Sequence, residues 1–204
     1  MLAQRVPTTA EILWRSVSPS FKRYLEALPI ISAIADLVKS ADDAAMRFDL
    51  YVYDLYSSED LNEYQGVVCV REDVYVYTCF SFWDDVDGTR LFASSSWGSF
   101  AGVSYRIDGR AAAIAYDRDY GLRLVCRRDE NRVWRCSGSD VSAEDAAKIA
   151  EEISRAIEDG LKRVFEKATG LARYILDECS RGAEWCDNRL ASKAGDVLLL
   201  IEGS

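Results

Sequence analysis

Residues 91–136 decide the fold, and they read LFASSSWGSFAGVSYRIDGRAAAIAYDRDYGLRLVCRRDENRVWRC. Turn-forming residues interrupt this stretch at short intervals, and Asp108-Gly109 is a dipeptide favoured in two-residue β-hairpins. Because short connections force neighbouring strands to be antiparallel, the segment predicts a meander. The expected strands cover residues 90–97, 100–107, 110–117, 122–128 and 132–138.

The meander extends toward the N-terminus. From Met46 the apolar residues alternate with polar ones, which predicts a half-buried strand over residues 46–53. Residues 67–71 and 74–83 then predict a hairpin around Glu72-Asp73. The predicted sheet therefore has about six to eight strands.

Three helices are expected before the sheet. Thr8-Thr9-Ala10-Glu11 fits a capping box, which predicts that a short helix follows. Ser18 followed by Pro19 predicts the start of a second helix, because proline is well tolerated at the first helical position. Pro29 interrupts the apolar period and predicts a third helix that ends near Ser40.

A long helix is expected after the sheet. Ser142 is a good N-cap, acidic residues follow it, and the helical period continues toward Arg181, with Gly160 and Gly170 as points of division or kinking. An apolar seam spaced at 4, 3, 4, 3 and 4 residues is made of Ile157, Leu161, Val164, Ala168, Leu171 and Ile175. Such a seam is typical of a coiled coil through which two copies associate, but a helix packed on its own sheet is the favoured interpretation. The apolar tail over residues 196–201 predicts a returning strand or a last helix.

These patterns predict an α+β fold: N-terminal helices, an antiparallel meander sheet, and a long C-terminal helix or helical hairpin that packs on the sheet. We expect a single domain over residues 1–204, with a helical part (1–45), the sheet (46–139) and a C-terminal helical part (140–204).

Composition removes several classes of chemistry. The chain has no histidine, so catalytic triads of the usual form and histidine-ligated metals are excluded. It contains no P-loop and no dinucleotide-binding motif. Asp84-Asp85-Val86-Asp87-Gly88 departs from the calcium-loop pattern, since serine stands where the last ligand belongs, and is interpreted as a turn. We therefore expect no catalytic residue, no metal and no cofactor, and an enzyme that uses carboxylates, lysines or tyrosines stays the less favoured alternative.

Six cysteines form three local pairs: Cys69 with Cys79, Cys126 with Cys136, and Cys179 with Cys186. In the first two pairs the even spacing of ten places both residues on one face of a predicted hairpin. We expect disulfides, although six cysteines allow 15 pairings and buried free thiols are the alternative. Cytosolic disulfides are typical of hyperthermophiles, and the few Asn and Gln residues also favour a thermophilic source.

The expected cellular location is the cytoplasm. The longest apolar stretch covers only 11 residues, from Leu28 to Val38, and already includes Asp36, whereas a bilayer span takes about 20. The first residues also lack the apolar core of a secretory signal.

Arginine and aromatic residues mark the sheet as the candidate site. Residues 46–139 contain 11 arginines and no lysine. The candidate binding residues are Arg118, Arg123, Arg127, Arg128, Arg132, Arg135, Tyr116, Tyr120, Trp134, Tyr75 and Tyr77. Arginine and aromatic side chains dominate protein interfaces, and they also hold single-stranded nucleic acid by pairing and stacking.

Three functions remain open. The leading hypothesis is a non-catalytic binding or assembly protein that uses its sheet face or C-terminal helix to contact a protein partner or a second copy. The second is single-stranded nucleic-acid binding, which the net charge of −9 opposes. The third is a small apolar ligand held beside the small residues Ala111-Ala112-Ala113.

Overall fold

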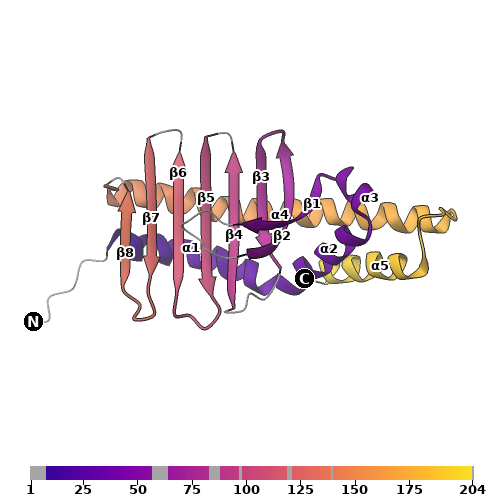
Figure 1. Ribbon diagram of the computed structural model, residues 1–204, viewed down its shortest axis with the longest axis horizontal. Coiled ribbons are helices and arrows are strands. Elements are labelled where there is room, and N and C mark those ends of the chain that lie inside the picture. Colours follow the sequence, from indigo (N-terminus) through magenta and orange to yellow (C-terminus); the bar gives the residue numbers. More distant parts are fainter. Residues whose placement is uncertain are drawn as a thin grey trace, which may run out of the picture.

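Eight antiparallel strands form one sheet in their sequence order, with long helices on one of its faces (Figure 1). The computed structural model describes residues 8–56, 64–82, 88–96, 98–118, 121–138 and 140–203. The predicted α+β meander is confirmed. Tyr120 and the acidic cluster at residues 84–87 lie outside the described residues.

The strands agree closely with the predicted turns. They are β1 (Leu50–Tyr56), β2 (Tyr64–Asp73), β3 (Val76–Ser81), β4 (Thr89–Ser96), β5 (Ser99–Arg106), β6 (Ala112–Arg118), β7 (Leu122–Arg128) and β8 (Trp134–Gly138). The prediction placed the first strand too early, because a short helix α3 (Asp42–Met46) and a turn precede Leu50.

The N-terminal helices are α1 (Thr9–Glu26) and α2 (Leu28–Ser40). The Thr8 capping box is present, but the predicted new helix at Ser18 is wrong. Pro19 lies inside α1, where its missing N–H removes one helical hydrogen bond. The helix continues through it, because buried residues on both sides, including Val17 and Phe21, pack into the core. The boundary at Pro29 holds, since this proline lies in the first turn of α2.

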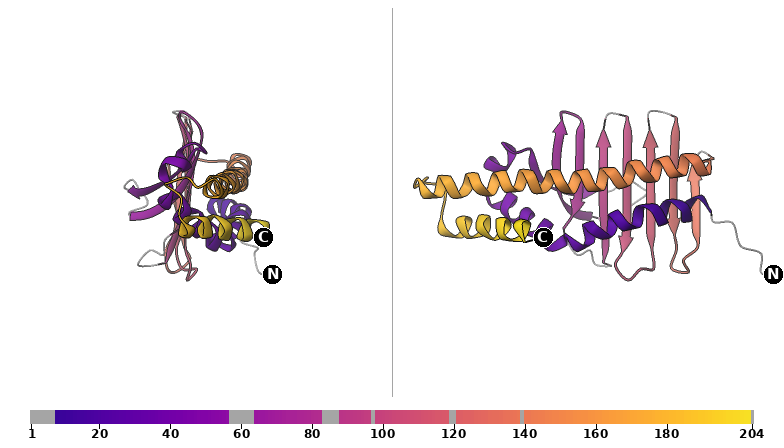
Figure 2. Two further views of the ribbon diagram at one scale, coloured as in Figure 1. Left: turned by 90° about the vertical axis from the view of Figure 1, so that its right-hand side faces the viewer. Right: turned by 180° about the vertical axis from the view of Figure 1, so that it is seen from behind.

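The C-terminal part is a helical hairpin. Helix α4 (Ala143–Ser180) begins at the predicted Ser142 cap and is undivided at both glycines, and α5 (Asn188–Glu202) contains the apolar tail. At 1.5 Å per residue α4 is about 57 Å long, whereas eight strands are about 34 Å wide. Helix α4 therefore extends beyond β1, where α5 folds back along it beside α2 (Figure 2).

Helices α1 and α4 cover one face of the sheet and run in the same direction (Figure 2). Ser154 Oγ donates to the Ser16 carbonyl, and Ser20 Oγ donates to Glu158. Later residues of α1 therefore contact later residues of α4, as in a parallel helix pair. The core lies between these helices and the sheet, and includes Phe80 and Phe92, whose ring centroids are 5.2 Å apart. We call this side the helix-covered face.

No described helix packs on the opposite face of β3–β8, which we call the open face (Figure 2). The outer ends of β1 and β2 bend across part of this face, and Val67 and Leu91 are buried there (Figure 1). Strand alternation and register assign its residues, because each residue lies beside its paired partners on the same side. One row of the open face is Tyr51, Cys69, Cys79, Ala93, Gly102, Ala115, Val125 and Ser137.

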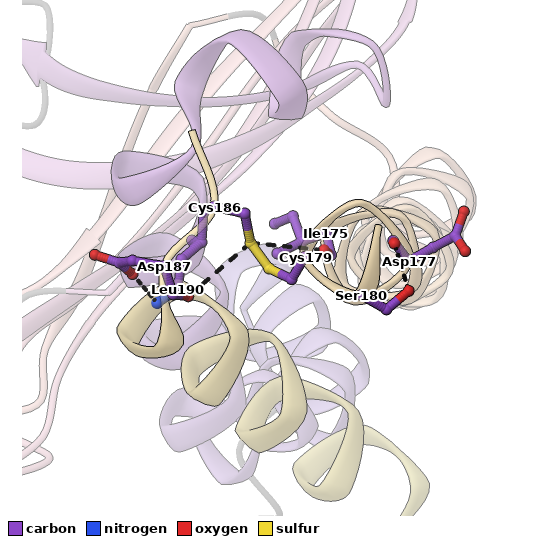
Figure 3. Close-up of a disulfide and its surroundings, with 7 residues drawn as sticks. All are labelled: Ile175, Asp177, Cys179, Ser180, Cys186, Asp187 and Leu190. Atoms are coloured by element: carbon purple, nitrogen blue, oxygen red, sulfur yellow. Dashed lines mark hydrogen bonds between the residues drawn. A yellow bond between two sulfur atoms is a disulfide. The ribbon is translucent and has the colours of Figure 1, made fainter. Parts of the chain in front are cut away.

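All three cysteine pairs are disulfides. Cys69 faces Cys79 directly across β2 and β3, and Cys126 faces Cys136 across β7 and β8, with Cα separations of 4.1 and 4.0 Å. The first bridge lies on the open face and the second on the helix-covered face. The third, between Cys179 and Cys186, closes the turn between α4 and α5 (Figure 3).

Candidate binding surfaces

The six clustered arginines do not share one surface. Arg123, Arg127 and Arg135 belong to the open face, since they alternate with Cys126, which is part of the core. Arg118 and Arg128 belong to the helix-covered face, and Arg132 lies in the turn between β7 and β8. The sequence cluster is therefore divided by the sheet itself.

The two described aromatic members of the cluster, Tyr116 and Trp134, lie on the helix-covered face. The hydroxyl of Tyr116 donates to Glu152 of α4 at 2.5 Å, and Arg118 forms an ion pair with the same carboxylate at 3.0 Å. Burial, together with the neighbouring Glu152 charge, raises the pKa of Tyr116 to about 12. Trp134 packs against Trp14 of α1, with ring centroids 5.9 Å apart. These two rings serve the core and its rim, so neither accompanies the open-face arginines.

A second aromatic group occupies the open face at the other end of the sheet. Tyr51 and Tyr53 stack with 5.7 Å between ring centroids, and the guanidinium of Arg71 lies 5.2 Å from the Tyr51 ring. Tyr77 pairs directly with Arg71 in the sheet register, whereas Tyr75 is 60% exposed in the β2–β3 turn. The predicted tyrosines therefore lie on or beside this group.

The two groups are too far apart to form one stacking platform. Five strand spacings separate β2 from β7, which amounts to about 24 Å. Between them lies a row of small residues, including Ala93, Gly102 and Ala115. The open face is therefore aromatic at one end, basic at the other and low in side-chain bulk between them.

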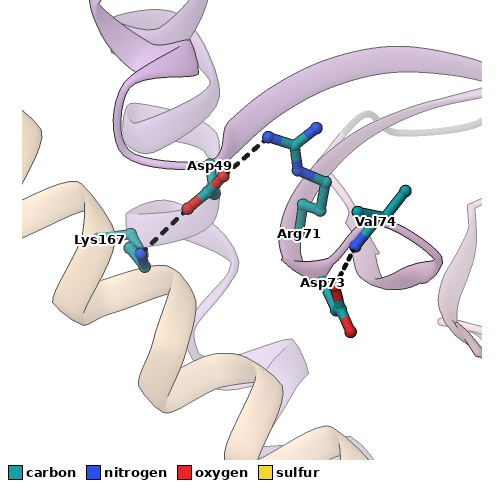
Figure 4. A network of polar contacts seen from close by, with 5 residues as sticks. All are labelled: Asp49, Arg71, Asp73, Val74 and Lys167. Atoms are coloured by element: carbon teal, nitrogen blue, oxygen red, sulfur yellow. Dashed lines mark hydrogen bonds and ion pairs between the residues drawn. The ribbon is translucent and has the colours of Figure 1, made fainter.

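Arg71 also belongs to a polar network that ties the sheet to α4 (Figure 4). Asp49 accepts from Arg71 at 3.0 Å and from Lys167 of α4 at 3.3 Å. The hydrogen bond from Arg71, with a smaller contribution from Lys167, lowers the pKa of the Asp49 carboxyl. Arg163 of α4 forms a further ion pair with Glu72. This network positions Arg71 on the open face and fixes α4 against the first strands.

The apolar seam of α4 is turned inward. Its six residues, Ile157, Leu161, Val164, Ala168, Leu171 and Ile175, are all buried within the chain and belong to the main core. This is the second of the two interpretations, a helix packed on its own sheet and helices. The seam residues therefore contact this chain's own core, and self-association through them stays a prediction that the fold does not favour.

A groove on the helix-covered side was not foreseen from the sequence. It lies between α1 and the β5–β6 and β7–β8 turns, has a volume of about 650 Å³, and is lined by Trp14, Phe21, Leu25, Tyr105, Arg128 and Arg132 among others. Trp14 stacks on Tyr105 at 5.5 Å and lies under Arg128 at 5.3 Å. Residues more than 100 positions apart build it, so no local sequence signal marks it.

No match was found when the chain was compared with protein-family models, curated proteins and solved structures. Among the described residues, no group of three Cys, Asp or Glu side chains is placed to hold a metal ion. None of the described helices is both long and apolar enough to cross a membrane.

Proposed function

We propose that this chain is a non-catalytic binding protein whose open sheet face contacts a protein partner that has an acidic surface. The observation that supports this proposal is the asymmetry of the sheet: α1 and α4 lie on one face, while the other carries an arginine group and a tyrosine group.

The composition of the open face suits a protein interface. Tyrosine and arginine are the side chains that most often dominate binding energy between proteins. The sheet measures about 34 Å across its strands and about 23 Å along them. Val67, Leu91 and Ala93 on this face are buried within the chain, so a partner would contact mainly its tyrosine and arginine ends.

Charge indicates the chemistry of the partner. The chain carries a net charge of −9, yet β7 and β8 place Arg123, Arg127 and Arg135 on the open face. Complementary charge speeds association and excludes wrong partners, so an acidic protein surface fits this end. Nucleic acid is the less favoured ligand, because the aromatic rings near these arginines lie on the other face.

A charge reversal at Arg135 tests the proposal. Arg135 is exposed on β8 and, within the described chain, has no ion-pair partner. In extracts of the native host, the wild-type chain should elute as a complex larger than 22.9 kDa, and Arg135→Glu should shift it toward the monomer. The matched control is Arg189→Glu on α5, which removes the same charge far from the open face and should leave the complex intact (Figure 1).

Two outcomes would contradict the proposal. Identical elution of wild type and Arg135→Glu would remove the open face as the interaction surface. A purified wild-type protein that binds single-stranded oligonucleotides at 50 mM salt, with loss of binding in Arg127→Ala, would assign the face to nucleic acid instead.

We further propose a cytoplasmic, heat-adapted protein. Two observations support this proposal: the chain has three disulfides, and it has few Asn and Gln residues. Disulfides are rare in cytoplasmic proteins except in those of hyperthermophiles.

A further inference from the structure

The groove between α1 and the β5–β6 and β7–β8 turns combines an apolar body with positive charge. Phe21 and Leu25 of α1 and Tyr105 of β5 supply its apolar lining, and Arg128 and Arg132 supply guanidinium groups. Its volume of about 650 Å³ lies within the range of small-molecule sites, roughly 300–1,000 Å³.

The two guanidiniums have no acidic partner among the residues that the structure describes. Within the described chain, no carboxylate lies within ion-pair distance of Arg128 or Arg132. Arg128 donates from Nη2 to the Gly109 carbonyl at 3.1 Å, while its buried Nε lacks a hydrogen-bond acceptor. Burial lowers the pKa of Arg128, and the positive charge of Arg132 adds to this effect. A pair of cations in this setting is stabilised by a bound anion.

The acids nearest in sequence are already engaged. Oδ1 of Asp129 accepts from the backbone N–H groups of Asn131 and Val133, which shapes the β7–β8 turn. Glu130 contacts Arg106 at 3.5 Å. Neither carboxylate therefore neutralises the groove.

Arg132 lines the groove from a backbone conformation that has an energetic cost. Its φ of 62° is in the left-handed region, which costs a residue with a Cβ roughly 1–2 kcal/mol. Glycine or asparagine is better suited to this backbone position. Arginine at this position therefore does not stabilise the turn, and its presence is consistent with a ligand-binding role.

We propose that this groove binds a small aromatic anion, a molecule with a flat apolar ring system and one carboxylate or phosphate group. The ring system would lie against Tyr105 and Leu25, and the anion would receive hydrogen bonds from Arg128 and Arg132. Guanidinium forks fit both carboxylate and phosphate oxygens. The site is on the opposite side of the sheet from the open face. Evidence against the proposed interface would therefore not count against this site.

Calorimetric titration with three matched probes tests this inference. The probes are 2-naphthoate, 2-naphthyl phosphate and the neutral 2-naphthalenemethanol. At least one anion should bind roughly ten times more tightly than the neutral alcohol, and the better anion identifies the charged group. Equal binding of all three would show a merely apolar groove and would overturn the proposal, as would no binding at millimolar concentration.

The variant Arg132→Asn separates binding from folding. Because asparagine tolerates the left-handed backbone better than arginine, the variant should be at least as stable as wild type. It should nevertheless bind the preferred anion about tenfold more weakly. Arg189→Gln, which removes one charge at the far end of the molecule, should bind as wild type does. An unchanged affinity in Arg132→Asn, or an equal loss in both variants, would contradict the assignment.

Discussion

Gly160 shows why a glycine inside a long helix need not mark a break. A Cβ at this position would collide with Cγ2 of Thr78 and lie 3.2 Å from the Phe80 ring. The glycine therefore lets α4 lie directly on β3. A similar approach occurs at Gly170, where a Cβ would be 3.0 Å from Phe48. From the sequence, both glycines were read as possible points of division, because a close approach to another element leaves no local signal.

The variant Gly160→Ala should be destabilised. Alanine favours a helix over glycine by about 1 kcal/mol, but the collision with β3 should cost about 1–3 kcal/mol and outweigh that gain. The matched control is Gly195→Ala in α5, where a Cβ would meet nothing within 4 Å and should stabilise by up to about 1 kcal/mol. Chemical denaturation measures both, and stabilisation by both alanines would contradict the close packing of α4.

Tyr116 makes stability depend on alkaline pH. Its pKa in the folded chain is about 12, above the ordinary value of 10.0, so the unfolded chain loses this proton first. The free energy of unfolding should therefore be unaffected by this group below pH 10 and should fall as pH rises from 10 toward 12. Urea titrations over this range should show a shallower fall in Tyr116→Phe. Equal slopes in the two proteins would contradict the burial of this hydroxyl beside Glu152.

The candidate residues were only partly predictable. Cys69 with Cys79 and Cys126 with Cys136 were correctly paired, because an even spacing across a short hairpin fixes both face and partner. Adjacent residues such as Arg127 and Arg128 must point to opposite faces of a strand, so one surface could not hold both. The alternation of residues along a strand does not show which face the helices cover. It also gives no sign that Trp14 and Arg128, which are far apart in sequence, are in contact.

At the scale of elements, turn chemistry made the sheet predictable while tertiary packing decided the helices. Strands β4 to β8 begin and end close to the predicted boundaries, since Gly and Asp residues mark their turns. The break expected at Ser18 does not occur, because packing of α1 against α4 holds the helix together through Pro19. The α4 stripe is also compatible with a dimer, and the elements that bury it in this chain are the sheet, α1 and α5.

The disulfide between Cys126 and Cys136 should secure the edge strand β8. For a closed loop of about ten residues, loss of the cross-link should lower stability by about 3 kcal/mol. We expect Cys126→Val with Cys136→Ser to show this loss in chemical denaturation, together with faster amide exchange along β8. Cys126 is fully buried, so valine keeps most of its volume.

A direct chemical check precedes that experiment. Alkylation of the unfolded protein without reductant should modify none of the six cysteines, because all are bonded. Mass measurement reads the result at once. Six modified cysteines would show that no disulfide forms.

At the scale of the whole molecule, the two sides of the sheet differ in role. One side holds the core, the long helices and the aromatic groove, and the other presents separate tyrosine and arginine groups. This division explains how a chain with a net charge of −9 keeps a local basic surface. It also separates the tests of the two proposed sites, since a change on one side leaves the other intact.

The proposed adaptation to heat is also a whole-molecule property. We expect the oxidised protein to unfold above about 80 °C, beyond the range of about 45–65 °C that is usual for mesophilic domains. Calorimetry on oxidised and reduced samples would measure the disulfide contribution. A midpoint below 65 °C for the oxidised protein would contradict a thermophilic source.

The most direct test of the open-face interface is site-specific photo-crosslinking in the native host. A photoreactive amino acid is placed at Ser95 or Ser137, which are exposed on the open face, and at Lys162 or Arg155, which are exposed on α4. We expect the two open-face positions to capture the same acidic protein and the two helix positions to capture none. Capture from α4 alone, or no protein captured from either open-face position, would contradict the proposed interface.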